Sequence, residues 1–146
     1  MEIFNRRAKF DYFIEEEYEA GIVLTGTEIK SVRNGHCNIK DSYGILKNNE
    51  VYLLNMFIGQ YKEGNIFNHD ETRIRKLLLH KTEIRKLHQK VKIKGYSVVP
   101  VRLYLKDGRA KLEIALAKGK ALYDKRETEK QRDVKREIEK AMKNNY

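Results

Sequence analysis

The residues best suited to catalysis lie in one polar loop, from Glu63 to Thr72. Within it, Asn68-His69-Asp70 precedes Arg73 and Arg75, which together would supply a general base, an acid and a phosphate clamp for a nuclease. The alternative is a structural loop whose Asn and Asp side chains hydrogen-bond to their own backbone. We favour the structural interpretation, because one His and two neighbouring acids fall short of the metal-binding carboxylate set that nucleases usually need.

Other catalytic and metal-binding motifs are missing from the sequence. It has no glycine-rich phosphate loop, no Gly-x-Ser-x-Gly and no His-Glu-x-x-His. His80 and His88 could share one helical face, but no other ligand type accompanies them. The lone Cys37 cannot form an internal disulfide. We therefore expect neither a metal nor a cofactor.

Basic residues are the more informative group. The chain has 31 Lys+Arg against 21 Asp+Glu, a net charge of +10, which favours a polyanionic partner, nucleic acid first. We expect Leu77-Leu78-Leu79 to be buried, with the surrounding cations left outside to bind phosphate. Sequence-specific single-strand motifs are absent, so the pattern predicts recognition of folded RNA by shape and backbone, and the alternative is a solvated basic face without a ligand. The cations in question are Arg73, Arg75, Lys76, His80, Lys81, Arg85 and Lys86.

The length of 146 residues suggests one domain. Runs such as Leu77-Leu78-Leu79 are far shorter than the roughly 20 apolar residues that a membrane helix needs. The first residues contain no apolar segment of the kind found in secretory signals. We therefore expect a soluble, cytoplasmic protein that does not enter a membrane.

Two hairpins dominate the expected secondary structure. Residues 43–58 contain two apolar runs joined by Asn48-Asn49, and residues 101–116 alternate apolar and polar side chains on both sides of Asp107-Gly108. In the second hairpin Val101, Leu103 and Leu105 are predicted to share one face. Pro100 precedes that run, where a strand start or edge tolerates its missing N–H.

Short helices and one long strand complete the pattern. Thr25 and Glu28 form a capping box that predicts a helix ending at Gly35, and a second helix is expected over residues 82–94. A strand is expected from Phe10 to Leu24, bent near Ala20-Gly21. So many short strands must close on themselves to hide their edges. We predict a mainly β fold with short helices (α+β): a small closed OB-like β-barrel with flanking helices.

The C-terminal segment differs in composition from the rest. Residues 119–146 carry 15 charged side chains in 28 positions, so we divide the chain into a folded body, 1–118, and a basic tail, 119–146. Val134, Ile138, Ala141 and Met142 form a thin apolar stripe at helical spacing. We predict that the tail is disordered alone and becomes helical in a polyanionic groove; an ordinary solvated extension is the alternative.

Four stretches of the chain form one further pattern. They are Asn5-Arg6-Arg7-Ala8 running into Tyr12 to Leu24, Gly26 to Ser31 continuing to Asn38-Ile39-Lys40-Asp41-Ser42-Tyr43, Asn68-His69-Asp70 with Arg73 to His80, and Ala117 to Lys120 followed by Tyr123 to Arg126. In this order and spacing, which span nearly the whole chain, the sequence resembles the SsrA-binding protein family, also called small protein B, of bacterial trans-translation.

The resemblance implies an OB-like barrel that is not an enzyme. Such a protein would bind the tRNA-like domain of transfer-messenger RNA (tmRNA) and carry it to stalled ribosomes. It would work indirectly with elongation factor Tu and alanyl-tRNA synthetase. Its tail would reach the decoding centre and run as a helix along the mRNA channel. We expect the free protein to be a monomer.

The resemblance also assigns site residues, position by position. The RNA-binding matches are Asn5, Glu19, Leu78 and Lys111, with Arg75 and Lys76 as basic surroundings. The ribosome-facing matches are Gly119, Tyr123, Asp124, Lys125 and Arg126. Glu19 could accept hydrogen bonds from ribose hydroxyls or base amines, or hold a nearby arginine, and a structural role for Glu19 and for Leu78 stays open. Glu71 stands where the family often has proline, so the shape of that loop stays open too.

Overall fold

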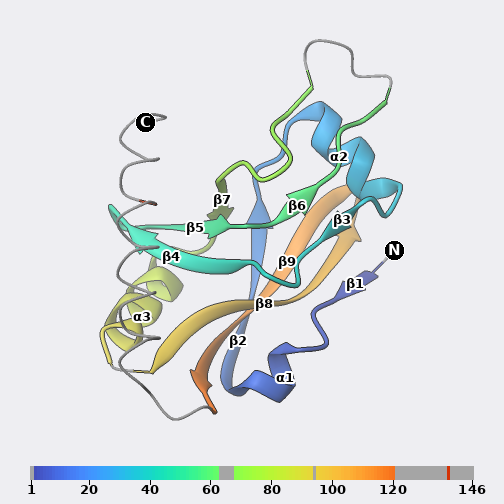
Figure 1. Ribbon diagram of the computed structural model, residues 1–146. Coiled ribbons are helices and arrows are strands. Elements are labelled where there is room, and N and C mark those ends of the chain that lie inside the picture. The colour runs from blue at the N-terminus through green and yellow to red at the C-terminus, as the bar shows by residue number, and fades with distance from the viewer. Residues whose placement is uncertain (1, 63–67, 94, 121–137, 139–146) are drawn as a thin grey trace.

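The computed structural model describes residues 2–62, 68–93, 95–120 and 138 (Figure 1). Three helices and nine strands alternate along these residues. In chain order they are β1 (Glu2–Phe4), α1 (Ala8–Asp11), β2 (Tyr12–Ile22), α2 (Gly26–Arg33), β3 (Cys37–Asn38), β4 (Tyr43–Lys47), β5 (Glu50–Leu54), β6 (Phe57–Ile58), β7 (Arg75–Leu78), α3 (Lys81–Val91), β8 (Tyr96–Lys106) and β9 (Arg109–Gly119).

The main sheet closes into a barrel. Its strand order is β1-β8-β4-β5-β7-β2-β9, and β8 also pairs with β9, so the strands from β8 round to β9 form a ring with β1 attached outside it. Every pairing is antiparallel. The ring closes between β4 and β8 at the single register pair Gly44↔Val98. A Cβ at position 44 would lie 2.8 Å from Val98 Cγ1, so only glycine lets the strands meet there.

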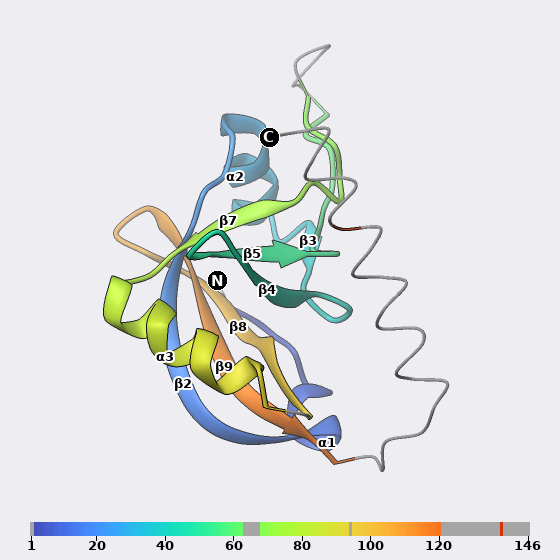
Figure 2. The same cartoon turned by 90° about the vertical axis from the view of Figure 1, so that its left-hand side faces the viewer.

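The interior of the ring is aliphatic, and the longer helices cover its two ends. Leu53, Leu77, Leu103 and Leu112 are fully buried there. The helix α3 adds Leu87 to this core, whereas α2 lies at the opposite end of the barrel (Figures 1 and 2). This is the closed OB-like barrel with flanking helices that the alternating pattern predicts.

Both predicted helices and the hairpin over residues 101–116 are confirmed. The hairpin expected over residues 43–58 is confirmed only for β4 and β5, because β5 ends at Leu54 and β6 pairs with β3 in a separate sheet. Asn48 and Asn49 have φ of 53° and 60°, and Asp107-Gly108 has 53° and 76°, which are the positive values of two-residue hairpin turns. The capping box joins Thr25 and Glu28 at the start of α2. The second helix, α3, starts one residue earlier than expected, because a second capping box begins at His80, and it ends three residues earlier than expected, at Val91.

The N-terminal prediction needs correction. Residues expected to begin a long strand instead form the short α1, and β2 begins at Tyr12. The irregularity in β2 lies between Ile14 and Glu16, where the register with β9 shifts. Near Gly21, β2 passes from its partner β9 to its other partner, β7. The strand β1 was not foreseen, because three residues carry too little pattern to be recognised.

Two details of β8 also differ from expectation. Pro100 lies inside the strand and is buried, beside a register shift between Pro100 and Arg102. The shift makes Val101 the extra residue of a β-bulge. Val101 therefore packs with Val99 and Ala115 beneath Ala8 of α1, in a different cluster from Leu103. A bulge also explains how the sheet accommodates a proline without an N–H.

Most of the tail lies outside the described residues, so its predicted disorder and helix formation are not addressed by the structure. Within the described part of the chain, the helices are all too short or too polar to cross a membrane.

Candidate nucleic-acid interface

Three of the expected RNA-binding residues come together on the outside of the barrel. Gly21 of β2 pairs with Leu78 of β7 on one side and with Lys111 of β9 on the other. Directly opposed residues point to the same face of a sheet, as do residues two apart, so Glu19 lies on this face as well. We call the surface formed by Glu19, Leu78, Lys111 and Tyr104 the β2 outer face.

Gly21 lies at the centre of the β2 outer face. Because it has no side chain, Leu78 and Lys111 on the neighbouring strands lie close to it. A Cβ at Gly21 would lie 3.3 Å from the Cβ of Leu78, which is tighter than ordinary contact. Leu78 is 53% exposed although it is a large aliphatic residue in a strand. The sequence prediction that Leu78 would be buried is therefore wrong, and the side chain is available to an apolar part of a ligand.

Glu19 is held in place by its neighbours. The Tyr104 hydroxyl donates a hydrogen bond to Glu19 Oε2, and Lys106 Nζ lies 3.6 Å from Glu19 Oε1. The hydrogen bond from Tyr104, with help from the charges of Lys106 and Lys111, lowers the pKa of Glu19. Burial, followed by the hydrogen bond to Glu19, raises the pKa of Tyr104 to about 12. At neutral pH the pair is thus a carboxylate bound to a neutral phenol.

Arg102 extends this polar network along β8. Its guanidinium lies 4.2 Å from the centre of the Tyr104 ring and forms ion pairs with Glu2 at 2.7 Å and Glu113 at 3.1 Å. Stacking and two carboxylates fix the arginine and the ring together. The network orients Tyr104, and through it Glu19. Tyr104 and Arg102 were foreseen only as polar positions of the hairpin.

The alternation of β7 sends neighbouring basic residues to opposite sides. Lys76 points outward with Leu78, and its Nζ lies 3.5 Å from Glu50 Oε1. Arg75 points inward with Leu77, and its side chain is fully buried. A residue without exposed surface cannot touch an RNA, so the expectation that Arg75 forms part of a basic binding surface is corrected to a supporting role.

The buried Arg75 holds α2 and the loop before β7 together. Its Nε donates to Glu28 Oε2, and its Nη1 donates to the carbonyl oxygen of Met56 at 2.7 Å. Arg73 donates to Glu28 Oε1 at 2.6 Å, and the Thr25 amide donates to the same atom at 2.8 Å. Burial works against the charge on Glu28, but the hydrogen bonds from Arg73 and Thr25 and the charge of Arg75 outweigh it and lower its pKa. The buried guanidinium of Arg75 is thus paired with the Glu28 carboxylate and with a backbone carbonyl oxygen.

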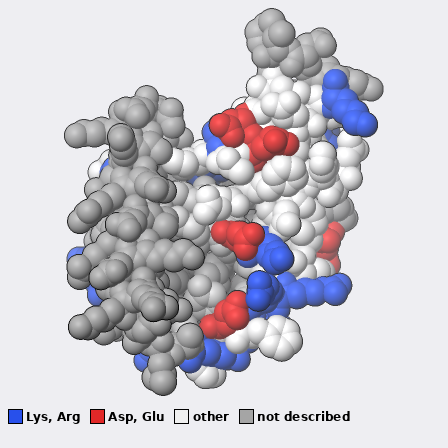
Figure 3. Space-filling view, in the orientation of Figure 1, with Lys and Arg blue, Asp and Glu red and all other residues white. Residues whose placement is uncertain are grey.

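Asn5 lies apart from the β2 outer face, at the end of β1. It is 9% exposed, and its side-chain amide donates to the carbonyl oxygen of Pro100 at 2.9 Å. Its Oδ1 is buried and has no hydrogen-bond partner among the described residues. Arg6, Arg7 and Lys40 surround it in a hollow of about 380 Å³. Figure 3 shows basic side chains gathered along this lower part of the molecule.

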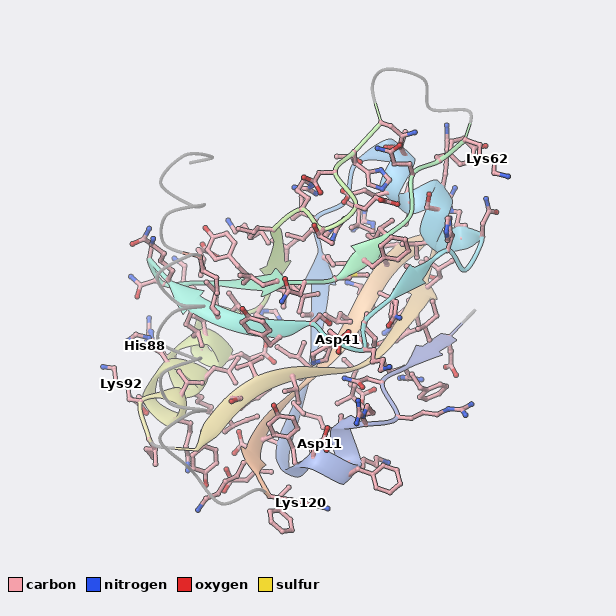
Figure 4. All side chains as sticks on the ribbon, viewed as in Figure 1. Asp11, Asp41, Lys62, His88, Lys92 and Lys120 are labelled. Atoms are coloured by element: carbon pink, nitrogen blue, oxygen red, sulfur yellow. The ribbon has the colours of Figure 1, made fainter. Side chains whose placement is uncertain are left out.

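Exposed aromatic rings accompany the basic residues near α1. Phe10 is 78% exposed and Phe13 is 62% exposed. Lys120 lies over the Phe13 ring at 4.9 Å and donates to the carbonyl oxygen of Lys9; Figure 4 labels it beside Asp11 of α1. The sequence did not identify these exposed rings. The signal was Phe10, Tyr12 and Phe13 within four residues, since one element cannot bury aromatic rings on every side.

The described part of the loop that could have been catalytic, residues 68–72, is tied into the fold by hydrogen bonds. His69 is 6% exposed; its Nε2 contacts the carbonyl oxygen of Ile58 at 2.9 Å and its Nδ1 contacts the Thr27 hydroxyl at 2.9 Å. A carbonyl oxygen only accepts, so Nε2 carries a hydrogen and donates to Ile58. The Asn68 and Asp70 side chains accept hydrogen bonds from nearby backbone amides. This geometry supports the structural interpretation of Asn68-His69-Asp70.

Of the ribosome-facing residues expected from the sequence, the structure describes only Gly119. It ends β9, pairs with Tyr12, and donates its amide hydrogen to the carbonyl oxygen of Gly95 at 3.1 Å. The other expected residues, Tyr123, Asp124, Lys125 and Arg126, lie outside the described residues. Gly119 therefore fixes where the tail leaves the barrel.

Fold and surface together define the class of the protein. A closed OB-like barrel whose outer surface groups cations with exposed apolar and aromatic side chains is typical of nucleic-acid-binding barrels. Groups of His, Cys, Asp or Glu able to hold a metal ion are not found in the part of the chain that the structure describes.

Residues 2–144 match the family model described as "SmpB protein", and the chain belongs to this family. It is 58% identical over 139 residues to the SsrA-binding protein of Halothermothrix orenii, covering 95% of this chain and 90% of that protein. It is 59% identical over 139 residues to the SsrA-binding protein of Caldanaerobacter subterraneus subsp. tengcongensis, covering 95% and 88%. These matches confirm the resemblance noted in the sequence.

A solved structure also matches the fold of this chain. The chain described as "tmRNA-SmpB: a journey to the center of the bacterial ribosome" superimposes with a TM-score of 0.71 at 46% sequence identity. The match covers 85% of this chain and 87% of that chain. The barrel and its flanking helices are therefore the fold of this family.

Proposed function

We propose that this protein binds the tRNA-like domain of tmRNA and delivers it to stalled ribosomes for trans-translation. Membership of the SmpB family supports this function, as do relatives named SsrA-binding protein and a structural neighbour described with tmRNA and the bacterial ribosome. The protein works as a cytoplasmic adaptor without chemistry of its own, and elongation factor Tu and alanyl-tRNA synthetase act on the RNA that it presents.

The observation that carries the proposal is the grouping of Glu19, Leu78 and Lys111 on the β2 outer face. These residues are far apart in sequence and differ in chemistry. Lys111 supplies a point charge for a phosphate, and Leu78 supplies an apolar contact for a base or ribose. Glu19 is repelled by phosphate, so it accepts hydrogen bonds from ribose hydroxyls or base amines. Such a mixture suits a folded RNA better than a featureless anionic surface.

Two further residues contribute at a distance from the β2 outer face. Arg75 holds the loop before β7 through buried contacts and so positions Lys76 and Leu78. Asn5 fixes the connection from β1 to α1 and presents Arg6 and Arg7 beside it. We assign Arg75 and Asn5 to positioning, and we assign Lys76 to phosphate contact.

The division of labour follows the composition of the chain. The body, 1–118, binds the RNA, and the tail, 119–146, contacts the ribosome from the point where Gly119 ends β9. In this proposal Tyr123, Asp124, Lys125 and Arg126 contact the decoding centre, and the following residues form a helix in the mRNA channel. The charged composition of the tail supports this role, because an anionic RNA channel attracts its cations.

A gel-shift titration with the isolated tRNA-like domain tests the RNA-binding half of the proposal. Lys111→Ala should weaken binding by about 1–3 kcal/mol and reduce the slope of log K against log salt by about 1. Lys92→Ala, beyond the end of α3, is the matched control and should change little. Equal losses in the two variants, or equal affinity for an unrelated structured RNA, would favour a generic RNA-binding barrel instead.

A chain ending at Lys118 tests the ribosomal half. It should bind the tRNA-like domain nearly as well as the full chain, yet fail to support tagging of nascent chains on stalled ribosomes. Circular dichroism of the truncated chain shows separately whether it is folded. Loss of RNA binding by a well-folded truncated chain would show that the division between body and tail is wrong.

A further inference from the structure

Basic side chains cover the exposed side of α3. The helix buries Ile84 and Leu87 in the core of the barrel, and the opposite side of the same turns carries polar and charged residues. Arg85 and Lys92 are seven residues apart, so they lie one above the other on this side. We call the surface formed by the exposed residues Arg85, Lys86 and Lys92 the α3 basic face.

The charge of the α3 basic face is not neutralised by neighbouring acids. Elsewhere on the barrel, Arg102 lies 2.7 Å from Glu2, and Lys76 Nζ lies 3.5 Å from Glu50 Oε1. The three residues of the α3 basic face have no ion pair within the part of the chain that the structure describes. Glu83 is the one acidic residue of α3, and its carboxylate accepts a hydrogen bond from the His80 amide at the start of the helix. The α3 basic face is therefore a positively charged surface that lacks a counter-charge on its own helix.

The composition of α3 indicates which anionic partner fits it. The helix contains no Phe, Tyr or Trp that could stack on an unpaired base. A helix that binds a membrane surface needs a free apolar face, but Ile84 and Leu87 are already packed in the core. Cations without stacking groups bind phosphates, and double-stranded RNA is contacted mainly through its phosphates and ribose hydroxyls. The α3 basic face is thus suited to the backbone of an RNA duplex.

The position of α3 indicates which RNA this is. Gly95 lies four residues beyond the end of α3, and its carbonyl oxygen accepts the amide hydrogen of Gly119 at 3.1 Å. Figures 1 and 2 show α3 and the end of β9 at the end of the barrel opposite α2. Lys111 of the β2 outer face lies eight residues before Gly119 on β9, which corresponds to roughly 26 Å along the strand. The C-terminal end of α3 therefore adjoins the point where the ribosome-directed tail leaves the barrel.

We infer that the α3 basic face binds the phosphate backbone of a ribosomal RNA duplex while the β2 outer face holds the tRNA-like domain. The inference rests on the function proposed above, because it assigns a ribosomal contact to the body of an adaptor that carries tmRNA. Two RNA contacts on different parts of the barrel let the body bridge the tRNA-like domain and the ribosome. The contact at α3 also fixes the barrel beside Gly119, so the tail starts from a defined point on the ribosome.

Removal of the three charges tests the inference in the full chain. The triple variant Arg85→Gln, Lys86→Gln and Lys92→Gln keeps residues that favour a helix, so α3 should stay folded, which circular dichroism checks. Binding to purified ribosomes is measured by sedimentation over a range of salt concentrations. The variant should bind about tenfold more weakly or worse at about 0.1 M salt, and the slope of log K against log salt should fall by about 2–3. Its binding to the isolated tRNA-like domain should change little.

The matched control removes three exposed cations from the opposite end of the barrel. It is the triple variant Lys30→Gln, Arg33→Gln and Lys62→Gln, on and near α2, and its salt slope for ribosome binding should stay close to that of the unchanged protein. Equal losses in the two triple variants would show that only net charge matters and would overturn the inference. Loss of tRNA-like domain binding by the α3 variant alone would overturn it as well, because the face would then belong to the tmRNA contact. If the unchanged protein itself fails to bind the tRNA-like domain, the proposed function is refuted instead.

A tethered iron–EDTA group identifies the partner of α3 directly. In a Cys37→Ser background, which removes the only cysteine, Gln89→Cys places the group on the exposed side of α3. Asn34→Cys places the same group at the end of α2 as the control. In ribosome complexes, hydroxyl radicals generated at position 89 should cut both strands of one ribosomal RNA duplex, and radicals from position 34 should not cut that duplex. Cuts from position 89 that are confined to tmRNA, or that appear in no RNA, would overturn the inference.

Discussion

Glu28→Gln is the sharpest test of how the barrel supports its outer surface. The substitution keeps the shape of the side chain but removes the charge that Arg75 and Arg73 share, and Arg75 has no access to water. Breaking a buried ion pair by removing one partner costs about 3–5 kcal/mol, because an uncompensated charge is left inside the protein. With a urea dependence of about 2 kcal/mol per molar, a loss of about 4 kcal/mol lowers the unfolding midpoint by about 2 M.

The assay is urea unfolding followed by circular dichroism at neutral pH, with Glu50→Gln as the matched control. Glu50 pairs with Lys76 across 3.5 Å, but both side chains are more than a third exposed, at 37% and 40%. An exposed pair contributes about 0–1 kcal/mol, so this variant should shift the midpoint by less than about 0.5 M. Equal midpoints for the two variants would refute the view that Glu28 holds a buried arginine pair in place.

Further predictions concern the closure of the ring, acid stability and the polar loop. Gly44→Val forces a side chain against Val98 and should destabilise the fold by about 1–3 kcal/mol in thermal unfolding, whereas Gly26→Ala, with open space around it, should not. The pKa of Glu28 lies below its usual value of 4.5 in the folded protein, so the stability that it contributes is present above that value and is lost as the pH falls through the folded pKa; the Glu28→Gln chain should show a flatter acid limb. His69→Ala should lower the melting temperature through lost hydrogen bonds, and any RNA cleavage that disappears with this variant would overturn its structural role.

The elements that the sequence predicts well are those encoded by neighbouring residues. Asn48-Asn49 and Asp107-Gly108 define their hairpins because residues with positive φ are needed at both turn positions. Thr25 and Glu28 define the start of α2 because their side chains satisfy amides within one turn. Each of these signals acts over a few residues and does not depend on how the barrel closes.

Three residues were predicted in the wrong place, because their burial depends on the sheet and on residues elsewhere in the chain. Arg75 was expected outside because charge normally avoids a core, and only the distant Glu28 makes its burial tolerable. Leu78 was expected inside because it is aliphatic, but alternation from Leu77 turns it outward. Val101 was assigned to the wrong cluster because a register shift at Pro100 cannot be read from alternation alone.

The candidate site was accessible to the sequence only through the family resemblance. Composition indicated a polyanionic partner, yet nothing in the spacing of Glu19, Leu78 and Lys111 says that they meet. Their meeting requires the crossing of β2 from β9 to β7 at Gly21, a property of the closed ring. The exposed rings of Phe10 and Phe13 were missed for the same reason, since burial depends on what packs over each face.

The closure at Gly44 and Val98 has a mechanical consequence. One register pair joins β4 to β8, whereas β8 and β9 are paired along most of their length. The ring therefore has two short joints, this one and the pairing of β2 with β7 at Gly21 and Ile22. Heat or mechanical force should open the barrel at these joints first, while the β8–β9 hairpin stays paired.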